Sequence, residues 1–159
     1  MTNSKVTPTA DRCGTCTFCC QAPIIPELKK PLGVMCQHCD GQRCKIYDHR
    51  PASCQNFWCV WAQKEGLDPN LRPDRCGVMF EKLRGANIYL AIVSPDTPDA
   101  WQQNNLVLDG IHGLLRNGAI VIIVIGPNTK KHLLLPEGKT IKEALAELNS
   151  IRPRYNLEV

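Results

Sequence analysis

The distribution of apolar residues divides this chain of 159 residues into two unlike parts. Residues 77–159 contain segments with clear strand or helix periodicity, whereas proline and glycine interrupt the short apolar stretches of residues 1–76. The first part therefore predicts loops and short helical turns. We expect an α+β protein in which an irregular N-terminal half, residues 1–76, packs on a small α+β domain, residues 77–159.

Four segments of the second half have the pattern of β-strands. Residues 77–83 and 88–93 are predicted as two strands, joined by a glycine-containing turn at residues 84–87. Residues 119–125, with the sequence AIVIIVI, are continuously apolar and β-branched. This composition predicts a central strand that is buried on both faces. A short edge strand is expected at residues 132–135.

Three helices are predicted from periodicity and capping signals. Residues 98–117 are expected to form one long helix with Thr97 as its N-cap. Residues 140–148 are expected to form another, in which Glu143 stands where a capping box requires it. In the first half, residues 55–66 are predicted as a short helix that carries two tryptophans three residues apart on one face.

The strongest chemical signal is the spacing of the cysteines. The chain has ten of them, and none lies beyond position 76. Residues 13–20 read CGTCTFCC, residues 36–44 read CQHCDGQRC, and a further pair stands at Cys54 and Cys59. A CxxC spacing lets one tight turn bring two sulfurs onto the same ion, as in zinc knuckles and iron–sulfur loops. The pattern therefore indicates metal binding in the N-terminal half.

Disulfides explain this crowding less well than metal ligation does. Cys19 and Cys20 are consecutive, so they could pair with each other only through a strained ring. A chain of this length can bury a core without cross-links. The polar N-terminus has no apolar stretch typical of a signal peptide, so we expect a cytoplasmic protein whose thiols stay reduced. Structural disulfides and unliganded thiols remain the alternatives.

The number of thiols exceeds what one ion requires. A tetrahedral zinc site takes four ligands, and a cubane iron–sulfur cluster normally takes four thiolates. Consecutive side chains diverge, so Cys19 and Cys20 are expected to serve different ions or to bridge within one multinuclear centre. The softness of thiolate ligands does not distinguish zinc from iron, because thiolates bind both metals. The candidate metal ligands are Cys13, Cys16, Cys19, Cys20, Cys36, Cys39, Cys44, Cys54 and Cys59.

Residues 13–59 resemble the YkgJ-type cysteine-cluster family, which is described as zinc- or iron-chelating. The family hallmark is CxxCxxCC, followed by a downstream cysteine pair and a CxIYxxRPxxCxxF segment. This chain has CGTCTFCC at residues 13–20, then Cys36, then CKIYDHRPASCQNF at residues 44–57. Where the family commonly has an apolar residue, this chain has Cys39, which is either an additional ligand or a small buried residue. The resemblance implies metal binding and no particular biochemical role.

Other residues near the cysteines are given supporting roles. Cys76 lies outside the motif and is not expected to be a ligand. Arg50 could donate hydrogen bonds to a thiolate or pair with a nearby aspartate. With ten sulfurs present, His38 and His49 are expected to be solvated or supporting residues. The aromatic residues of the first half are expected to dock it onto the second half, and shielding of the site from water is the alternative; they are Tyr47, Phe57, Trp58 and Trp61.

Composition narrows the classes of function. The net charge of +4 is spread along the chain without the basic cluster of a nucleic-acid-binding face. The longest apolar run, residues 119–125, is too short to span a bilayer, and nothing isolates one cysteine as a catalytic nucleophile. Three hypotheses remain: a non-enzymatic zinc- or iron-binding protein, an iron–sulfur redox or sensor protein, and a zinc-stabilised module whose C-terminal half binds a protein partner.

Overall fold

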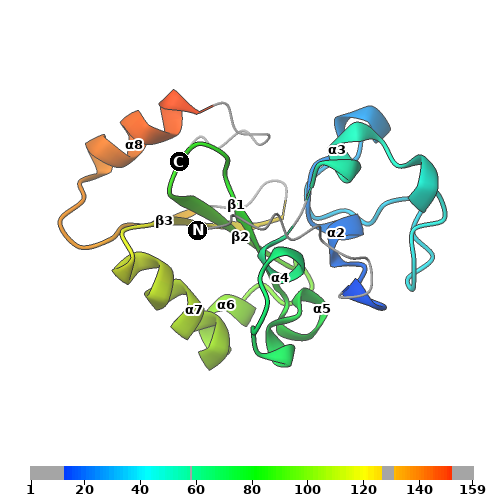
Figure 1. Cartoon of the computed structure of the whole chain (residues 1–159), viewed down its shortest axis with the longest axis horizontal. Coiled ribbons are helices and arrows are strands. Elements are labelled where there is room, and N and C mark those ends of the chain that lie inside the picture. The colour runs from blue at the N-terminus through cyan, green and yellow to red at the C-terminus, as the bar shows by residue number, and fades with distance from the viewer. Residues whose placement is uncertain (1–12, 58, 127–130, 152–159) are drawn as a thin grey trace, which may run out of the picture.

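The computed structural model describes residues 13–57, 59–126 and 131–151, and it shows helices arranged around a mixed β-sheet (Figure 1). Neighbouring strands of the sheet are consecutive in sequence. The outer pairs are antiparallel and the central pair is parallel. The α+β class is therefore confirmed. The strands are β1 (Val78–Lys82), β2 (Ile88–Val93), β3 (Ile120–Ile125) and β4 (His132–Leu134).

The strands form where local sequence patterns predicted them. The segment between β1 and β2 contains Gly85, whose φ of +82° lies in the left-handed region that a tight turn uses. Strand β3 is an inner strand, and residues 120–124 are buried, as the run of β-branched residues requires. Strand β4 lies at the edge of the sheet, next to β3.

The single helix predicted for residues 98–117 is wrong, because two helices occupy this segment. Helix α6 (Ala100–Gln103) is followed by helix α7 (Asn105–Arg116). Asn104 separates them with an extended backbone, and its side chain accepts hydrogen bonds from the backbone N–H groups of the second and third residues of α7. This asparagine, and not Thr97, caps the long helix.

The structure confirms the predicted start of the C-terminal helix. Helix α8 (Ile141–Ser150) begins with a complete capping box. The Glu143 N–H donates to Oγ1 of Thr140 at 3.3 Å, and the Thr140 N–H donates to Oε2 of Glu143 at 2.8 Å. The two residues satisfy each other's backbone donors at the exposed end of the helix.

The N-terminal half has short helical turns and loops, as predicted. The helix predicted for residues 55–66 is wrong: α3 ends at Gln55 and α4 begins at Val60. Cys59 has extended backbone angles, φ −70° and ψ 158°, and this interrupts the helical path. Trp58 lies outside the described residues. The short elements are α2 (Phe18–Gln21), η1 (Pro26–Leu28), η2 (Tyr47–His49), α3 (Ala52–Gln55), α4 (Val60–Gln63), η3 (Pro69–Leu71) and α5 (Pro73–Cys76).

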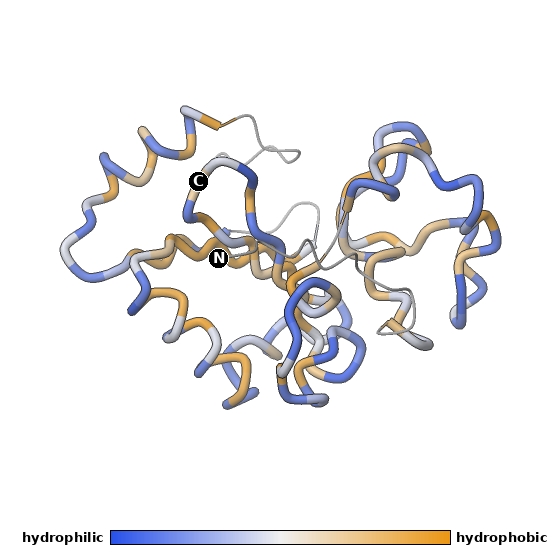
Figure 2. The backbone as a smooth tube through the Cα atoms, viewed as in Figure 1, coloured by the Kyte–Doolittle hydropathy of each residue, from blue (hydrophilic) through white to orange (hydrophobic). Residues whose placement is uncertain are grey.

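Both faces of the sheet are covered, and Figure 2 shows how apolar its strands are. On one face, Val107 and Ile111 of α7 pack against alternate residues of β2 and β3. On the other face, α8 and the cysteine-bearing segments share one core with the sheet. The residues that this second core takes from the N-terminal half include Phe18, Ala22, Leu32, Phe57, Cys59 and Ala62.

This shared core fixes the position of the cysteine-bearing segments. Phe57 is 8% exposed and belongs to the same cluster as Met79, Leu90 and Ile122 of the sheet. Burial of an aromatic side chain is a large stabilising contribution. The segment that carries the cysteines is therefore anchored to the sheet by ordinary apolar packing. No helix within the described ranges is long and apolar enough to cross a membrane.

Candidate metal centre

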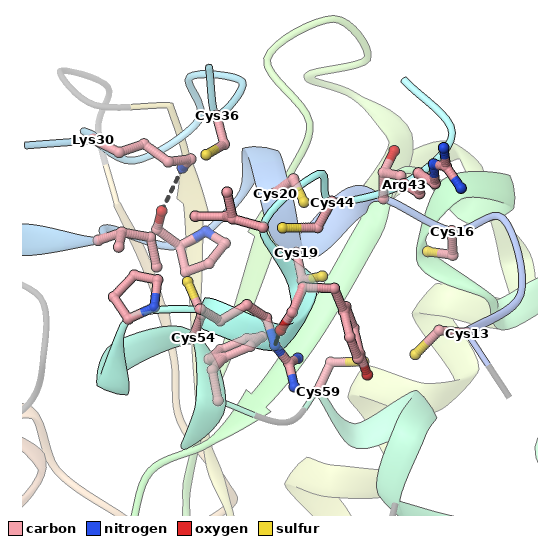
Figure 3. Close-up of a pocket in the computed structure, with 18 of the residues that line it drawn as sticks. Cys13, Cys16, Cys19, Cys20, Lys30, Cys36, Arg43, Cys44, Cys54 and Cys59 are labelled. Atoms are coloured by element: carbon pink, nitrogen blue, oxygen red, sulfur yellow. Dashed lines mark hydrogen bonds between the residues drawn. The ribbon is translucent and has the colours of Figure 1, made fainter. Parts of the chain in front are cut away.

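One cavity of about 200 Å³ collects most of the cysteines (Figure 3). The fold brings three stretches of sequence to it, residues 13–20, 36–44 and 54–59. Apolar side chains and the cationic residues Lys30, Arg43 and Arg50 also line it. The cysteines that line the cavity are Cys13, Cys16, Cys19, Cys20, Cys36, Cys44, Cys54 and Cys59.

The first stretch positions its sulfurs by two tight turns. The Cys16 N–H donates to the Cys13 carbonyl at 2.8 Å, and the Cys20 N–H donates to the Thr17 carbonyl at 2.8 Å. Gly14 in the first turn has a φ of +52°, a conformation that L side chains rarely adopt. The CxxC spacing thus folds the chain back on itself, and α2 follows immediately.

The second stretch is a narrow hairpin tied to the first. The Cys36 N–H donates to the Cys20 carbonyl at 2.9 Å, which joins the two stretches directly. Cys39 and Cys44 then face each other as an antiparallel bridge. The chain reverses between them with Gly41 in the left-handed region, at a φ of +89°.

The third stretch brings two cysteines from successive short helices. Within α3, the Cys54 N–H donates to the Pro51 carbonyl at 2.9 Å. Cys59 precedes α4, and its carbonyl accepts from the Ala62 N–H at 3.1 Å. Phe57 lies between these cysteines in sequence and also lines the cavity. The residue that anchors this stretch to the sheet is therefore part of the cavity wall.

Eight of the nine cysteines proposed as ligands line this cavity, and the ninth, Cys39, does not. The Cys39 side chain instead forms a hydrogen bond with the side chain of Cys20. Cys76, which sequence analysis left out of the ligand set, lies elsewhere. It is buried, its thiol donates to the Val78 carbonyl at 3.1 Å, and it lines a different cleft.

Arg50 and the two histidines among the cysteines differ in their relation to the cavity. Among the described residues that line the cavity there is neither His38 nor His49. The Arg50 Nε donates to the Tyr47 carbonyl at 2.8 Å, and its guanidinium lies 3.7 Å from the centre of the Tyr47 ring. Arg50 also interacts electrostatically with the sulfur of Cys19. Of the two partners that the sequence left open for Arg50, a thiolate or an aspartate, the thiolate of Cys19 is the one that this interaction favours.

Hydrogen bonding and burial give the cavity thiols different pKa values. A hydrogen bond from Cys20 lowers the pKa of Cys19 to about 7, and the same contact raises the pKa of Cys20. Cys19 is an exposed residue, although its sulfur is turned toward the other groups of the cavity. Burial raises the pKa of Cys16 to about 11 and that of Cys59 to about 12. Before any metal binds, Cys19 is the thiol most readily ionised of these four.

Sequence analysis missed Lys30, a buried cation at the cavity. Its residue is 6% exposed, and its ammonium donates to the carbonyls of Gln21 at 2.7 Å, Pro23 at 2.5 Å and Pro31 at 3.2 Å. Burial lowers the pKa of Lys30 to about 8, against the opposing effect of nearby thiols. Lysine is seldom buried, so only the three-dimensional arrangement could identify this residue.

A further cation, Arg72, stands beside the first CxxC turn. The Arg72 Nε lies 2.6 Å from Oδ1 of Asp74, and this contact raises the pKa of Arg72. Arg72 also interacts electrostatically with Cys13 and Cys16. The backbone of Asp74 forms a hydrogen bond with the Cys16 thiol. Residues just before β1 therefore border the first CxxC turn.

The donor chemistry of the cavity fits a thiophilic metal. Its thiols are soft ligands that zinc and iron both accept. Within residues 13–57, 59–126 and 131–151, no three Cys, His, Asp or Glu side chains already converge as metal ligands. The cavity therefore supplies suitable donors without a finished coordination sphere.

No family model, curated protein or solved structure matches this chain. The resemblance of residues 13–59 to the cysteine-cluster family therefore stays a prediction from its motif. The function is therefore proposed from the thiols that line the cavity.

Proposed function

We propose that this chain is a metal-binding protein that coordinates zinc or iron through the cysteines of the cavity. One observation carries the proposal: eight thiols from three stretches of sequence line the same cavity of about 200 Å³. Cysteines without a common role would not be expected to line one cavity in this number. Four thiolates suffice for a tetrahedral zinc ion or a cubane cluster, so the donor number is ample.

Binding requires the thiols to lose their protons. A metal ion stabilises the thiolate form, and each thiol that becomes a ligand releases its proton to solvent. Burial holds the pKa values of Cys16 and Cys59 high, so these thiols stay protonated until a metal replaces the proton. Metal affinity is therefore expected to fall as the pH is lowered.

An iron–sulfur redox or sensor protein is the second candidate, and the cations beside the thiols favour it. Lys30 and Arg50 both interact electrostatically with Cys19. The potential of an iron–sulfur cluster depends on nearby charge and on hydrogen bonds to its sulfurs. When bound, such a cluster would supply one-electron transfer, and these side chains would adjust its potential. A structural zinc ion would instead hold the three stretches together.

Anaerobic purification followed by elemental analysis tests the proposal. A stoichiometric metal is expected, and absorbance near about 400 nm would assign it to an iron–sulfur cluster, whereas a colourless protein with zinc would assign it to zinc. Cys16→Ser is expected to lower the metal content, because it removes a cavity sulfur. Cys76→Ser is the matched control and is expected to keep it. Equal loss in both variants, or no metal in the wild-type protein even after reconstitution, would reject the proposal.

A further inference from the structure

We propose that Cys39 and Cys44 form a reversible redox pair, which closes a disulfide across the hairpin of the second stretch when a small disulfide such as oxidised glutathione is the oxidant. The two residues face each other as an antiparallel bridge. Of the two, Cys44 lines the thiol cavity and Cys39 does not. The pair therefore gives a role to the one candidate ligand that the cavity leaves out.

Two backbone hydrogen bonds bracket this pair and define its type. The Asp40 N–H donates to the Arg43 carbonyl at 3.2 Å on the turn side of the bridge. The Lys45 N–H donates to the His38 carbonyl at 2.8 Å on the other side. The bridging cysteines thus occupy a position of the non-hydrogen-bonded kind. At such a position the Cα atoms lie about 4.5 Å apart, and the side chains approach each other most closely.

This spacing suits a disulfide. Ordinary disulfides join cysteines whose Cα atoms are about 4.4–6.8 Å apart and whose Cβ atoms are about 3.5–4.5 Å apart. Directly opposite residues of an antiparallel pair share one face, with their Cβ atoms about 4.5–5.5 Å apart and closer in non-hydrogen-bonded pairs. The bond therefore needs little movement of the backbone.

The turn keeps the two cysteines opposite each other before any bond joins them. Oδ1 of Asp40 accepts hydrogen bonds from the N–H groups of Gln42 at 3.0 Å and Arg43 at 2.8 Å. Gly41 supplies the left-handed conformation that the reversal requires, at a φ of +89°. Groups held in the right geometry react as if they were highly concentrated. The hairpin therefore favours closure over pairing with a distant thiol.

A small oxidant can approach the pair from the turn. Residues 40–43 are exposed, and both cysteines are half-buried. Cys59, by contrast, is buried in the core that includes the sheet. The hairpin thiols are therefore easier to reach than the thiol at the far end of the motif.

The reaction uses one molecule of oxidised glutathione and is balanced. The thiolate of one cysteine attacks a glutathione sulfur, forms a mixed disulfide and expels one glutathione thiolate. The other cysteine then attacks the protein sulfur of the mixed disulfide and expels the second glutathione. The protein thiols lose two electrons and two protons, and both pass to glutathione. Excess reduced glutathione reverses the two steps.

Cys20 is the competing partner for Cys39. The side chains of these two residues share a hydrogen bond, which Cys39 must give up to pair with Cys44. The backbone favours Cys44, because the bridge sets it directly opposite. The backbone hydrogen bond that ties the hairpin to the first stretch instead joins Cys36 to Cys20.

The pair has a consequence that rests on the proposed function, although the disulfide itself does not. Closing the bond takes the sulfur of Cys44 out of the set of cavity thiols. Metal ligation requires a free thiolate. Oxidation of the hairpin and metal binding therefore compete for the same sulfur.

Disulfide mapping of the full-length chain, reduced and treated with chelator, tests the pair. The protein is equilibrated with oxidised and reduced glutathione, alkylated, and digested with trypsin without reduction. Arg43 lies between the two cysteines, so trypsin leaves two peptides that only their disulfide joins. Fragmentation then distinguishes Cys39 from Cys36, which lies in the same peptide. The bond between Cys39 and Cys44 is expected in more chains than any other disulfide, and excess reduced glutathione should remove it.

Matched variants check the assignment. Cys44→Ala should lose the linked peptides, whereas Cys36→Ala and Cys20→Ala should keep them. The map of the wild-type chain decides the question even where a variant fails to fold. If wild-type Cys39 is linked mainly to Cys20, or is still alkylated at a large excess of oxidised glutathione, the redox pair is rejected.

Repeating the map after zinc loading separates this proposal from the proposed function. Bound metal is expected to lower the yield of the hairpin disulfide, and equal yields with and without metal would reject the competition for Cys44. A chain that takes up no zinc or iron but forms the disulfide rejects the proposed function and supports the redox pair. A chain that binds metal but pairs Cys39 with another cysteine does the reverse.

Discussion

The shared core makes Phe57→Ala a direct test of how the cysteine-bearing segments are held. Phe57 is 8% exposed, lines the thiol cavity and belongs to the core that includes the sheet. Truncating a buried phenylalanine removes its transfer free energy and leaves a void, at a cost of about 3–5 kcal/mol. Since domains are stable by about 5–15 kcal/mol, this is a large share of the total.

Urea unfolding of the metal-loaded protein, followed by circular dichroism, measures the effect. With a slope of about 2 kcal/mol per molar urea, Phe57→Ala should lower the midpoint by about 1.5–2.5 M. Tyr47→Ala is the matched control, because Tyr47 also lines the cavity but is 41% exposed. Its loss should cost about 1 kcal/mol or less, mainly from the cation–π contact with Arg50. Equal midpoint shifts in the two variants would refute the shared core.

Three further outcomes follow from the structure. Chelation should remove hydrogen-exchange protection from residues 13–59 and leave the central strands protected. The reason is that metal supplements the small apolar content of residues 13–59. Uniform loss of protection along the chain would contradict this. In the reduced, metal-free protein, alkylation mapped by mass spectrometry should modify Cys19, with its pKa of about 7, before Cys16, with its pKa of about 11; equal rates at about pH 8 would contradict this. Hydrogen bonds from Thr140 hold the pKa of Glu143 below its usual value of about 4.3. The stability that these bonds provide is therefore present above that pH, and it is lost as the pH falls through the lower pKa of the folded state. Glu143→Gln should remove this acid-dependent part of the urea midpoint, and an unchanged pH profile would count against the capping box.

Local patterns were sufficient for the regular part of the fold. The strands and the capping box of α8 depend on short stretches whose periodicity or capping residues are explicit in the sequence. The prediction of one helix over residues 98–117 fails at Asn104, which interrupts the helical path. Its side chain competes for the backbone donors that follow it, and this interaction starts α7 afresh.

The cysteine spacing also predicted which thiols gather, but not how the cavity is completed. Eight of the nine cysteines singled out by their spacing line the cavity, and whether they are ligands stays a prediction. Lys30 could not be identified from the sequence, because its burial depends on three carbonyls supplied by the surrounding loop. The extended backbone at Cys59 is not evident from the sequence either; Phe57 and Ala62, on either side of it, belong to the core that includes the sheet.

The central claim is that the cavity thiols bind metal, and counting protected thiols tests it most directly. Protein isolated anaerobically should react slowly with a thiol reagent and carry almost no disulfide. After chelation, about eight thiols should become reactive, as two four-ligand sites or one larger shared centre would require. If all ten cysteines react fully before chelation, or most are already paired as disulfides, the cavity is not a metal centre.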